Sequence, residues 1–200
     1  DHVLTIYETA QLTIAFSERV SGLDLADLTV ENGSLDALST SDEGLTWTAT
    51  FTAAARVSDA TNLITLDNTG VADLAGNAGA GSTHSAEYSV DSIVPSATIT
   101  MSDTELTTGE TAIVTISFSE AVLGMDGSKV GAPNGSLSPF TSGDGGLTWT
   151  SVFTPTEGIS SPPTWISLNT RGITDLAGNT AVNETNSGYY SVNTLAPQKP

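Results

Sequence analysis

The sequence predicts an all-β protein made of two tandem β-sandwich domains, and two observations carry this prediction. First, a shift of 102 positions aligns the chain with itself without a gap, from Asp1 on Asp103 to Pro95 on Pro197, with 41 of 95 pairs identical. A period of about one hundred residues corresponds to a whole domain, since solenoid units are about 20 to 50 residues long. Second, apolar and polar residues alternate throughout, and no helical period is sustained.

Strands are expected wherever apolar and β-branched residues alternate. The clearest cases are residues 11–17, where Leu12, Ile14 and Phe16 face one way, and the matching residues 113–119. Turn signals such as Asn32-Gly33 and Gly76-Asn77 separate the expected strands. About seven short strands per hundred residues is typical of an immunoglobulin-like β-sandwich. The remaining expected strands of the first repeat are 28–30, 34–38, 45–51, 62–67 and 85–90.

The repeat alignment also sets the domain boundaries, at residues 1–93 and 94–200, the latter including a C-terminal linker. Residues 95–102 provide a leading strand for the second repeat, whereas Asp1 already aligns with Asp103. The first repeat is therefore expected to lack its leading strand. We expect the chain to be a fragment of a longer array, and no signal peptide is visible.

Composition narrows the classes of function. Aspartate and glutamate number 23 against 5 lysine and arginine, which gives a formal net charge of −18. Nucleic acid binding is disfavoured because phosphate contacts need a basic surface. The chain has no cysteine, so neither disulfides nor thiolate metal sites are possible. No apolar run is long enough to insert into a membrane. Oxygen-ligated divalent cations would neutralise clustered carboxylates; the alternative is a solvated acidic surface.

Both repeats carry the same ordered set of motifs: Phe-Ser-Glu at a strand end, Asn-Gly, Leu-Thr-Trp-Thr, Asp-Leu-Ala-Gly-Asn, and Tyr-Ser-Val before a proline-containing linker. In the first repeat these lie at residues 16–18, 32–33, 45–48, 73–77 and 88–90. The set resembles the bacterial Ig-like repeats of giant surface adhesins, including the repeats-in-toxin adhesins secreted by type I systems. The resemblance implies extracellular extender modules that hold a ligand-binding tip away from the bacterial cell, with calcium stiffening the linkers.

The strand order predicts where a cation would bind. Glu120 at a strand end, Asp126 in the following loop, and Asp175 with Asn179 in the last long loop are expected at one pole of the second domain. The linker that begins at Asp91 enters at the same pole. We expect a Ca²⁺ site formed by Asp91, Glu120 and Asp175, with Asp126 and Asn179 as further candidates, since Ca²⁺ takes six to eight oxygen ligands.

The equivalent residues of the first repeat are expected to bind Ca²⁺ at a junction with a preceding module. They are Glu18, Asp24, Asp73 and Asn77. The expected partners are thus neighbouring repeats of the same chain, in a monomer. Asp91 aligns with Asn193, which brings no charge, so the next junction is expected to bind Ca²⁺ more weakly.

A purely structural role for these residues remains open. Asp-Leu-Ala-Gly-Asn can be a tight turn in which Asp accepts a backbone amide, Gly takes a positive φ, and Leu enters the core. The other loop aspartates, Asp24, Asp126, Asp42 and Asp144, can equally be turn residues. Glu18 and Glu120 follow a core phenylalanine at a strand end, where a solvated carboxylate is common.

Enzymatic activity is not expected. The two histidines, His2 and His84, are not repeated, and no serine nucleophile motif or His-rich metal spacing occurs. Trp47 and Trp149 occupy equivalent strand positions, and Trp165 aligns with Leu63 and is expected in the core. Two alternatives to an extender remain: an adhesin module that itself binds a glycan, protein or ice, and a non-catalytic spacer of a secreted hydrolase.

Overall fold

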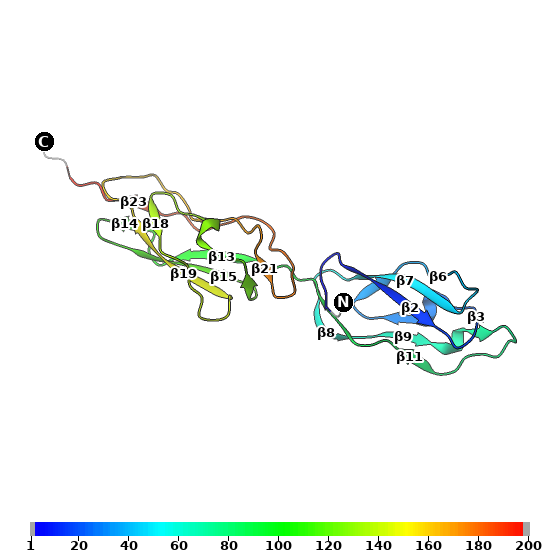
Figure 1. Cartoon of the computed structure of the whole chain (residues 1–200). Coiled ribbons are helices and arrows are strands. Elements are labelled where there is room, and N and C mark those ends of the chain that lie inside the picture. Colours follow the sequence, from blue (N-terminus) through cyan, green and yellow to red (C-terminus); the bar gives the residue numbers. More distant parts are fainter. Residues whose placement is uncertain (1–2, 198–200) are drawn as a thin grey trace. The chain divides into compact units, whose positions relative to one another are not determined.

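The computed structural model describes residues 3–197. Two compact units meet at the Ile93–Val94 bond, Asp1–Ile93 (unit 1) and Val94–Pro200 (unit 2). Both are built from strands and a few short 3-10 helices (Figure 1). The predicted class, all-β with two Ig-like sandwiches, is confirmed. Among the described residues, no helix is long and apolar enough to cross a membrane.

Unit 2 has a four-stranded antiparallel sheet in the order β13-β15-β19-β18. The facing layer contains the paired strands β16-β21, the ladder β17-β20-β22, and β14, which pairs in parallel with β23. This is the strand distribution of an immunoglobulin sandwich. The bounds are β13 Ala97–Met101, β14 Glu105–Thr107, β15 Ala112–Phe118, β16 Val122–Leu123, η3 Gly127–Lys129, β17 Val130–Gly131, β18 Gly135–Leu137, β19 Thr148–Pro155, β20 Ser167–Leu168, β21 Thr174–Asp175, β22 Thr185–Asn186 and β23 Ser191–Asn193.

Unit 1 repeats most of this arrangement at positions 102 residues earlier. Among the described residues, no strand of unit 1 corresponds to β13, and β6 and β8 of unit 1 have no strand counterpart in unit 2. The first sheet of unit 1 has the order β2-β7-β5, with β6 also on β7, so that β2 is an edge strand. The bounds are β1 Val3–Leu4, β2 Thr9–Ala15, β3 Val20–Ser21, η1 Leu25–Asp27, β4 Leu28–Val30, β5 Gly33–Leu35, β6 Ser39–Thr40, β7 Thr46–Ala53, β8 Ser58–Asn62, β9 Ile64–Asp67, η2 Asn68–Gly70, β10 Ala72–Asp73, β11 Ser82–His84 and β12 Tyr88–Asp91.

The strand predicted over 62–67 is interrupted at Leu63, which was not foreseen. The Leu63 amide donates to the Glu31 carboxylate at 2.7 Å and not to a ladder. The chain also changes partners there, because β8 pairs with β12 whereas β9 pairs with β4 and β11. Of the strand predicted over 85–90, only residues 88–90 lie in a strand, β12, because residues 85–87 form the connection from β11, which ends at His84.

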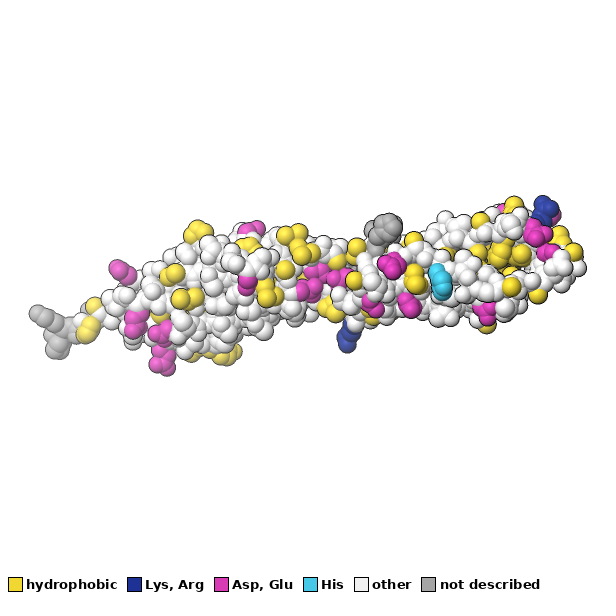
Figure 2. Space-filling model, turned by 90° about the horizontal axis from the view of Figure 1, so that it is seen from below, with side chains coloured by type: hydrophobic (Ala, Val, Ile, Leu, Met, Phe, Trp, Pro, Cys, Tyr) yellow, Lys and Arg dark blue, Asp and Glu magenta, His cyan; other side chains and the backbone are white. Residues whose placement is uncertain are grey.

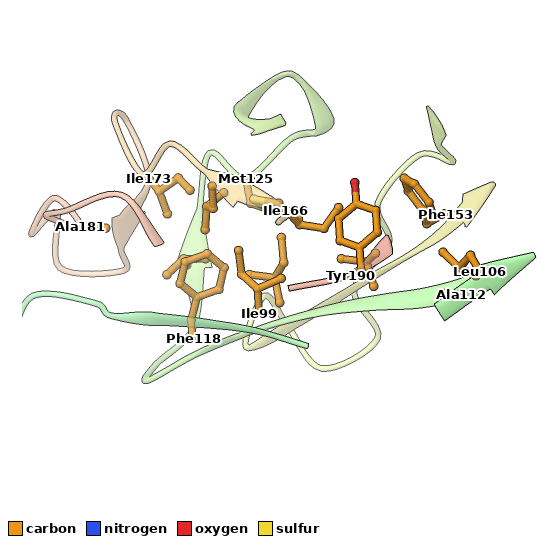
Figure 3. Close-up of a cluster of buried hydrophobic side chains, with 14 of the residues drawn as sticks. Ile99, Leu106, Ala112, Phe118, Met125, Phe153, Ile166, Ile173, Ala181 and Tyr190 are labelled. Atoms are coloured by element: carbon orange, nitrogen blue, oxygen red, sulfur yellow. The ribbon is translucent and has the colours of Figure 1, made fainter. Parts of the chain in front are cut away.

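The core of unit 2 is continuous. Phe153 and Tyr190 are buried in it and pack edge to face, with ring centroids 5.3 Å apart and planes at 71° (Figure 3). The Tyr190 hydroxyl donates to the Pro133 carbonyl, and burial raises the pKa of Tyr190 to about 12. Gly135 lies against this aromatic pair, where an added Cβ would stand 2.2 Å from a Phe153 ring atom. Residue 135 must therefore be glycine for the ring to fit.

The core of unit 1 is divided into two clusters. One surrounds Phe51, whose ring meets Tyr88 edge to face at 5.2 Å, and the other surrounds Val20 and Leu66. Leu12 is half-buried, whereas its counterpart Val114 is fully buried. The inward side of β2 is thus incompletely covered.

Candidate metal centre

The candidate site of unit 2 is formed where two short strands pair at one end of the sandwich. The ladder between β16 and β21 places Val122 opposite Asp175. Glu120 lies two residues before Val122, directly after β15 ends at Phe118. A carboxylate oxygen of Glu120 and one of Asp175 consequently lie within 4.8 Å of each other.

The entering chain reaches unit 2 beside this pair. The Ser119 amide donates to the Ser96 carbonyl at 2.8 Å, and the Ser96 amide donates to the Ser119 hydroxyl at 3.0 Å. Ser119 is the neighbour of Glu120 in sequence. The first residues of unit 2 are therefore fixed next to the acidic pair.

Asp175 organises the Asp-Leu-Ala-Gly-Asn turn. Its Oδ1 accepts from the amides of Gly178 at 2.6 Å and Asn179 at 2.8 Å, and its Oδ2 accepts from Asn179 Nδ2 at 2.8 Å. Gly178 has φ +108°, a conformation that favours glycine. Asp175 is only 2% exposed. The expected tight turn is present. Because the side-chain nitrogen Nδ2 of Asn179 donates to Asp175, the side-chain oxygen Oδ1 of Asn179 is the atom that could ligate a cation.

One expectation about this turn is wrong. The leucine does not enter the core: Leu176 is 72% exposed and its counterpart Leu74 is 74% exposed. The turn projects beyond β21 and β10, so its leucine lies outside the layer between the sheets. Packing therefore does not explain this position.

Asp91 belongs to unit 1. It is the last residue of β12, is half-buried, and has Ser58 as its Cα partner in β8. Its Oδ1 accepts a long hydrogen bond of 3.4 Å from the Ile93 amide. Three residues separate it from Pro95, and it is the last acidic residue before unit 2.

Unit 1 has the equivalent constellation. Glu18, Asp73 and Asn77 line one open pocket near the end of β2. The hydrogen bonds from the side chain and the amide of Asn77 hold the pKa of Asp73 below its usual value. These three predicted residues are thus brought together within unit 1, with Asn77 exposed and Asp73 half-buried.

Asp24 and Asp126 each cap a short 3-10 helix. Asp24 Oδ1 accepts from the Ala26 amide at 2.7 Å. Asp126 Oδ1 accepts from the Ser128 hydroxyl and from the Ser128 amide, and these bonds lower the pKa of Asp126. Within the described range, Asp126 does not join the Glu120–Asp175 pair. The capping role accounts for both aspartates without a cation.

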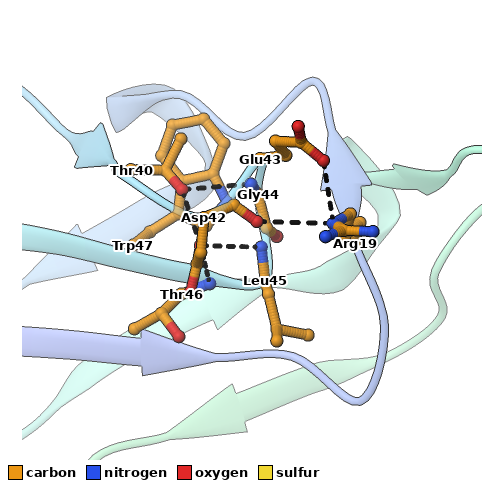
Figure 4. A network of polar contacts seen from close by, with 8 residues as sticks. All are labelled: Arg19, Thr40, Asp42, Glu43, Gly44, Leu45, Thr46 and Trp47. Carbon is orange, nitrogen blue, oxygen red and sulfur yellow. Dashed lines mark hydrogen bonds and ion pairs between the residues drawn. The ribbon is translucent and has the colours of Figure 1, made fainter.

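Asp42 and Asp144 organise the loops before β7 and β19. Asp42 Oδ1 accepts from the amides of Thr46 at 2.8 Å and Leu45 at 3.1 Å, and from the Thr40 hydroxyl at 2.9 Å (Figure 4). Asp144 accepts from the Thr148 amide and the Ser142 hydroxyl, both at 2.9 Å. The Thr46 and Thr148 amides are the main reason that the pKa values of Asp42 and Asp144 are lowered.

The hydrogen bonds of Asp42 and Asp144 predict that acid lowers the stability of each unit through its own loop aspartate. Because the folded state lowers the pKa of Asp42, the stability it contributes is present above the unfolded pKa, near 4, and is lost as pH falls through the lower folded value. We expect the unfolding midpoint of unit 1 to fall more steeply below about pH 4 in the parent chain than in Asp42→Asn. Asp144→Asn is the matched control, which should flatten the acid dependence of unit 2 only. Equal slopes in all three proteins, measured by calorimetry, would contradict this role.

The structure corrects the expectation for Trp165. It is 42% exposed and its ring meets the exposed Tyr189 ring edge to face, with centroids 5.7 Å apart. The counterparts in unit 1 are Leu63 and Glu87. Alignment with a leucine suggested a core position, but Leu63 is itself only half-buried, and an indole at this place extends beyond the layer.

Figure 2 shows acidic side chains dispersed over the visible face, with isolated lysine and arginine side chains among them. One ion pair, Arg19 with Glu43 at 3.3 Å, is exposed and therefore contributes little to stability. The general surface is acidic without being organised, whereas the Glu120–Asp175 pair is held in place by backbone pairing. This pair is the best-defined candidate for cation binding within the described part of unit 2.

The two units are thus tandem, non-identical Ig-like domains, and each has a group of acidic residues at one end of its sandwich. A family model described as a bacterial Ig-like domain matches residues 1–90 and again residues 91–192. The chain therefore belongs to the bacterial Ig-like domain family, as the motif set predicted. No curated protein matches the chain.

Among solved structures, one match is to a chain described as FdeC, a broadly conserved Escherichia coli adhesin. The sequences are 12% identical, the TM-score is 0.37, and the alignment covers 96% of this chain and 61% of that chain. A superposition this loose carries no information about function.

Proposed function

We propose that the chain is a pair of extender modules from a bacterial cell-surface adhesin, and that Ca²⁺ bound where one repeat enters the next restricts the linker. The observation that carries the proposal is the Glu120–Asp175 pair, fixed beside the entering chain at Ser96. Tandem membership of the bacterial Ig-like family supports it. The proposed location is extracellular, on the bacterial surface, with type I secretion as the proposed export route.

The donor set suits Ca²⁺. Two carboxylates within 4.8 Å repel each other when both are ionised, and a hard divalent cation between them replaces repulsion with attraction. Asn179 can add an amide oxygen, and backbone carbonyls or water can complete six to eight ligands. Mg²⁺ would require a stricter octahedron of shorter bonds.

We propose that Asp91 supplies the third carboxylate. Five residue steps join Asp91 to Ser96, which hydrogen-bonds to Ser119, so the covalent chain keeps Asp91 within about 17 Å of Ser96 at full extension. A ligand from each side of the linker would restrict the motion of two domains otherwise joined by a short tether. The same logic assigns Glu18, Asp73 and Asn77 to a junction with another repeat.

The proposal predicts a calcium response of the 200-residue chain. We expect Ca²⁺ at about 100 times its dissociation constant to stabilise the liganded fold by about 2.7 kcal/mol. We also expect the maximum dimension from small-angle scattering to increase and the range of conformations to become narrower. Calorimetry and scattering, with and without chelator, measure both effects. Mg²⁺ at the same concentration should produce a smaller response.

Matched variants locate the effect. Glu120→Gln and Asp91→Asn should each weaken Ca²⁺ binding roughly tenfold or more, because calcium affinity depends on the number of charged ligands. Glu18→Gln, the equivalent change at the far end of unit 1, should leave the linker response intact. An unchanged scattering profile in millimolar Ca²⁺ would overturn the proposed stiffening.

One observation favours a second candidate function, ligand binding by the module itself. The exposed Trp165–Tyr189 pair occurs in unit 2 only and has the character of a stacking surface for a sugar or peptide. We prefer the extender function because the acidic group occurs in both repeats, as Glu120 with Asp175 in unit 2 and as Glu18 with Asp73 in unit 1. Binding of a glycan or protein that is lost in Trp165→Ala would favour the second candidate. A spacer role within a secreted hydrolase would show the same calcium response.

A further inference from the structure

We propose that unit 2 carries a binding site for neutral glycans on the outer face of the ladder formed by β17, β20 and β22. Its centre is the exposed ring pair of Trp165 and Tyr189. The inference deepens the second candidate function named above by giving its ligand class. It uses none of the residues of the candidate metal centre, so it can be tested separately from the calcium proposal.

The backbone fixes both rings on the outer face of unit 2. Thr164 and Tyr190 exchange two backbone hydrogen bonds of 2.8 Å. On the β20 side of this pairing the two segments continue with Trp165 and Tyr189, whose rings meet edge to face with centroids 5.7 Å apart. Tyr190 and Ile166 are buried. Because successive side chains in an extended chain point to opposite faces, Trp165 and Tyr189 point outward.

Neutral polar side chains lie next to the rings on the same face. In the ladder, Ser167 is paired with both Gly131 and Asn186. Ser167 lies two residues after Trp165, so the two side chains share the outward face. Within the described part of the chain, the side chains of Ser167 and Asn186 make no hydrogen bond. A hydroxyl and a carboxamide are therefore available to a ligand beside the rings.

Two glycines keep the surface low around these groups. An added Cβ at Gly131 would stand 2.6 Å from the Ser167 hydroxyl oxygen and would displace it. An added Cβ at Gly188, the residue before Tyr189, would meet nothing within 4 Å, so the space there is open. A ligand can consequently reach the rings and the hydroxyl from the solvent side.

Unit 1 has the same backbone pairing with different side chains. Leu63 and Glu87 take the places of the two rings. Thr65 and His84, at the positions of the serine and the asparagine, hydrogen-bond to each other at 2.9 Å. The polar groups of unit 1 thus satisfy one another, and no aromatic face adjoins them. The sandwich does not require the ring pair, and its occurrence in unit 2 calls for another explanation.

The groups on this face fit a neutral pyranose. The C–H groups of a sugar ring pack on an aromatic face, while its hydroxyls need a few polar partners at the edge of that face. The formal net charge of −18 opposes the binding of acidic sugars. A cationic peptide would be held mainly by carboxylates, whereas the groups paired next to Trp165 are a serine and an asparagine. The observations therefore favour a neutral glycan over a basic peptide.

The test is an NMR titration of the 200-residue chain with calcium chelated. The probes are neutral hexasaccharides of glucose, mannose, galactose and N-acetylglucosamine. We expect at least one of them to shift the indole N–H signal of Trp165 and the side-chain amide signals of Asn186 saturably. The indole signals of Trp47 and Trp149, which are bonded to backbone carbonyls, should stay in place.

Matched variants locate the site. Trp165→Ala should weaken binding, followed at Asn186, by about tenfold or more. Its unfolding midpoint should stay close to that of the parent, because the indole lies outside the core cluster. Asn186→Ala should also weaken binding, whereas Leu63→Ala, the equivalent of the tryptophan change in unit 1, should not. The calcium response of Trp165→Ala should equal that of the parent chain, so either proposal can fail without the other.

Three results would overturn the inference. The first is the absence of a saturable shift with all four hexasaccharides. The second is binding of tetralysine at the same signals without binding of any glycan, which would assign the rings to a cationic peptide. The third is equally tight binding of a sialylated oligosaccharide, which would contradict the preference for neutral sugars.

Discussion

Phe153→Ala is expected to lower the free energy of unfolding of unit 2 by about 3–5 kcal/mol. Phe153 is fully buried in the core, meets Tyr190 edge to face, and lies over Gly135. Truncation removes the transfer free energy of the ring and leaves a cavity that surrounding strands can fill only in part. Calorimetry resolving the transitions of the two units, or denaturant unfolding followed by hydrogen exchange, measures the loss.

The repeat provides controls for this substitution. Val152→Ala changes the neighbouring residue, whose side chain is 43% exposed, and is expected to cost little. Phe51→Ala removes the equivalent ring of unit 1, and we expect a smaller loss because that core is divided and its β2 side is open. A Phe153→Ala protein as stable as the parent would contradict the single-core description of unit 2.

Asp175→Ala is expected to destabilise unit 2 by about 2–4 kcal/mol in the absence of calcium. The carboxylate accepts two backbone amides and the Asn179 side chain in a buried turn, and hydrogen bonds to a charged acceptor are worth about 1.5–3 kcal/mol each. Asp175→Asn retains an acceptor oxygen and should cost less, about 1 kcal/mol. Chemical unfolding in chelator measures both variants.

This pair of substitutions separates the two roles left open by the sequence. If Asp175 is a turn residue alone, Asn should preserve both the fold and any calcium response. If it is also a ligand, Asn should preserve the turn and lose the response. Asp73→Ala is the matched change in the more exposed turn of unit 1 and should be less harmful, since water can replace the lost acceptor. Equal losses for Asp175→Ala and Asp175→Asn would contradict the hydrogen-bond assignment.

Substitutions in the core and substitutions at the proposed calcium site are therefore expected to change stability differently with and without calcium. Core substitutions such as Phe153→Ala should lower stability equally with and without calcium. Glu120→Gln should act mainly through calcium, because Glu120 follows β15 outside the central core. Comparing the two classes of variant in the same titration distinguishes a bound cation from a general effect of salt on an acidic protein.

Much of the fold was predictable because strand patterning is local. The alternation at Leu12 and Ile14 identified the inward face of β2, and the repeat fixed the correspondence between the units. Boundaries were less predictable: the break at Leu63 depends on a hydrogen bond to Glu31, 32 residues away. The exposure of Leu176 and Trp165 was also missed, because an apolar side chain alone does not reveal whether its backbone lies between the sheets or beyond them.

The sequence by itself determined the class, the duplication and the family, because hydrophobic period and repeated motifs are properties of order along the chain. It also nominated Glu120, Asp175 and Asn179. Only the tertiary structure decided which of these side chains meet, because proximity depends on the β16–β21 pairing, and that Asp126 and Asp24 cap helices. It also decided that Leu176 and Trp165 are exposed, since burial is a property of both sheets together.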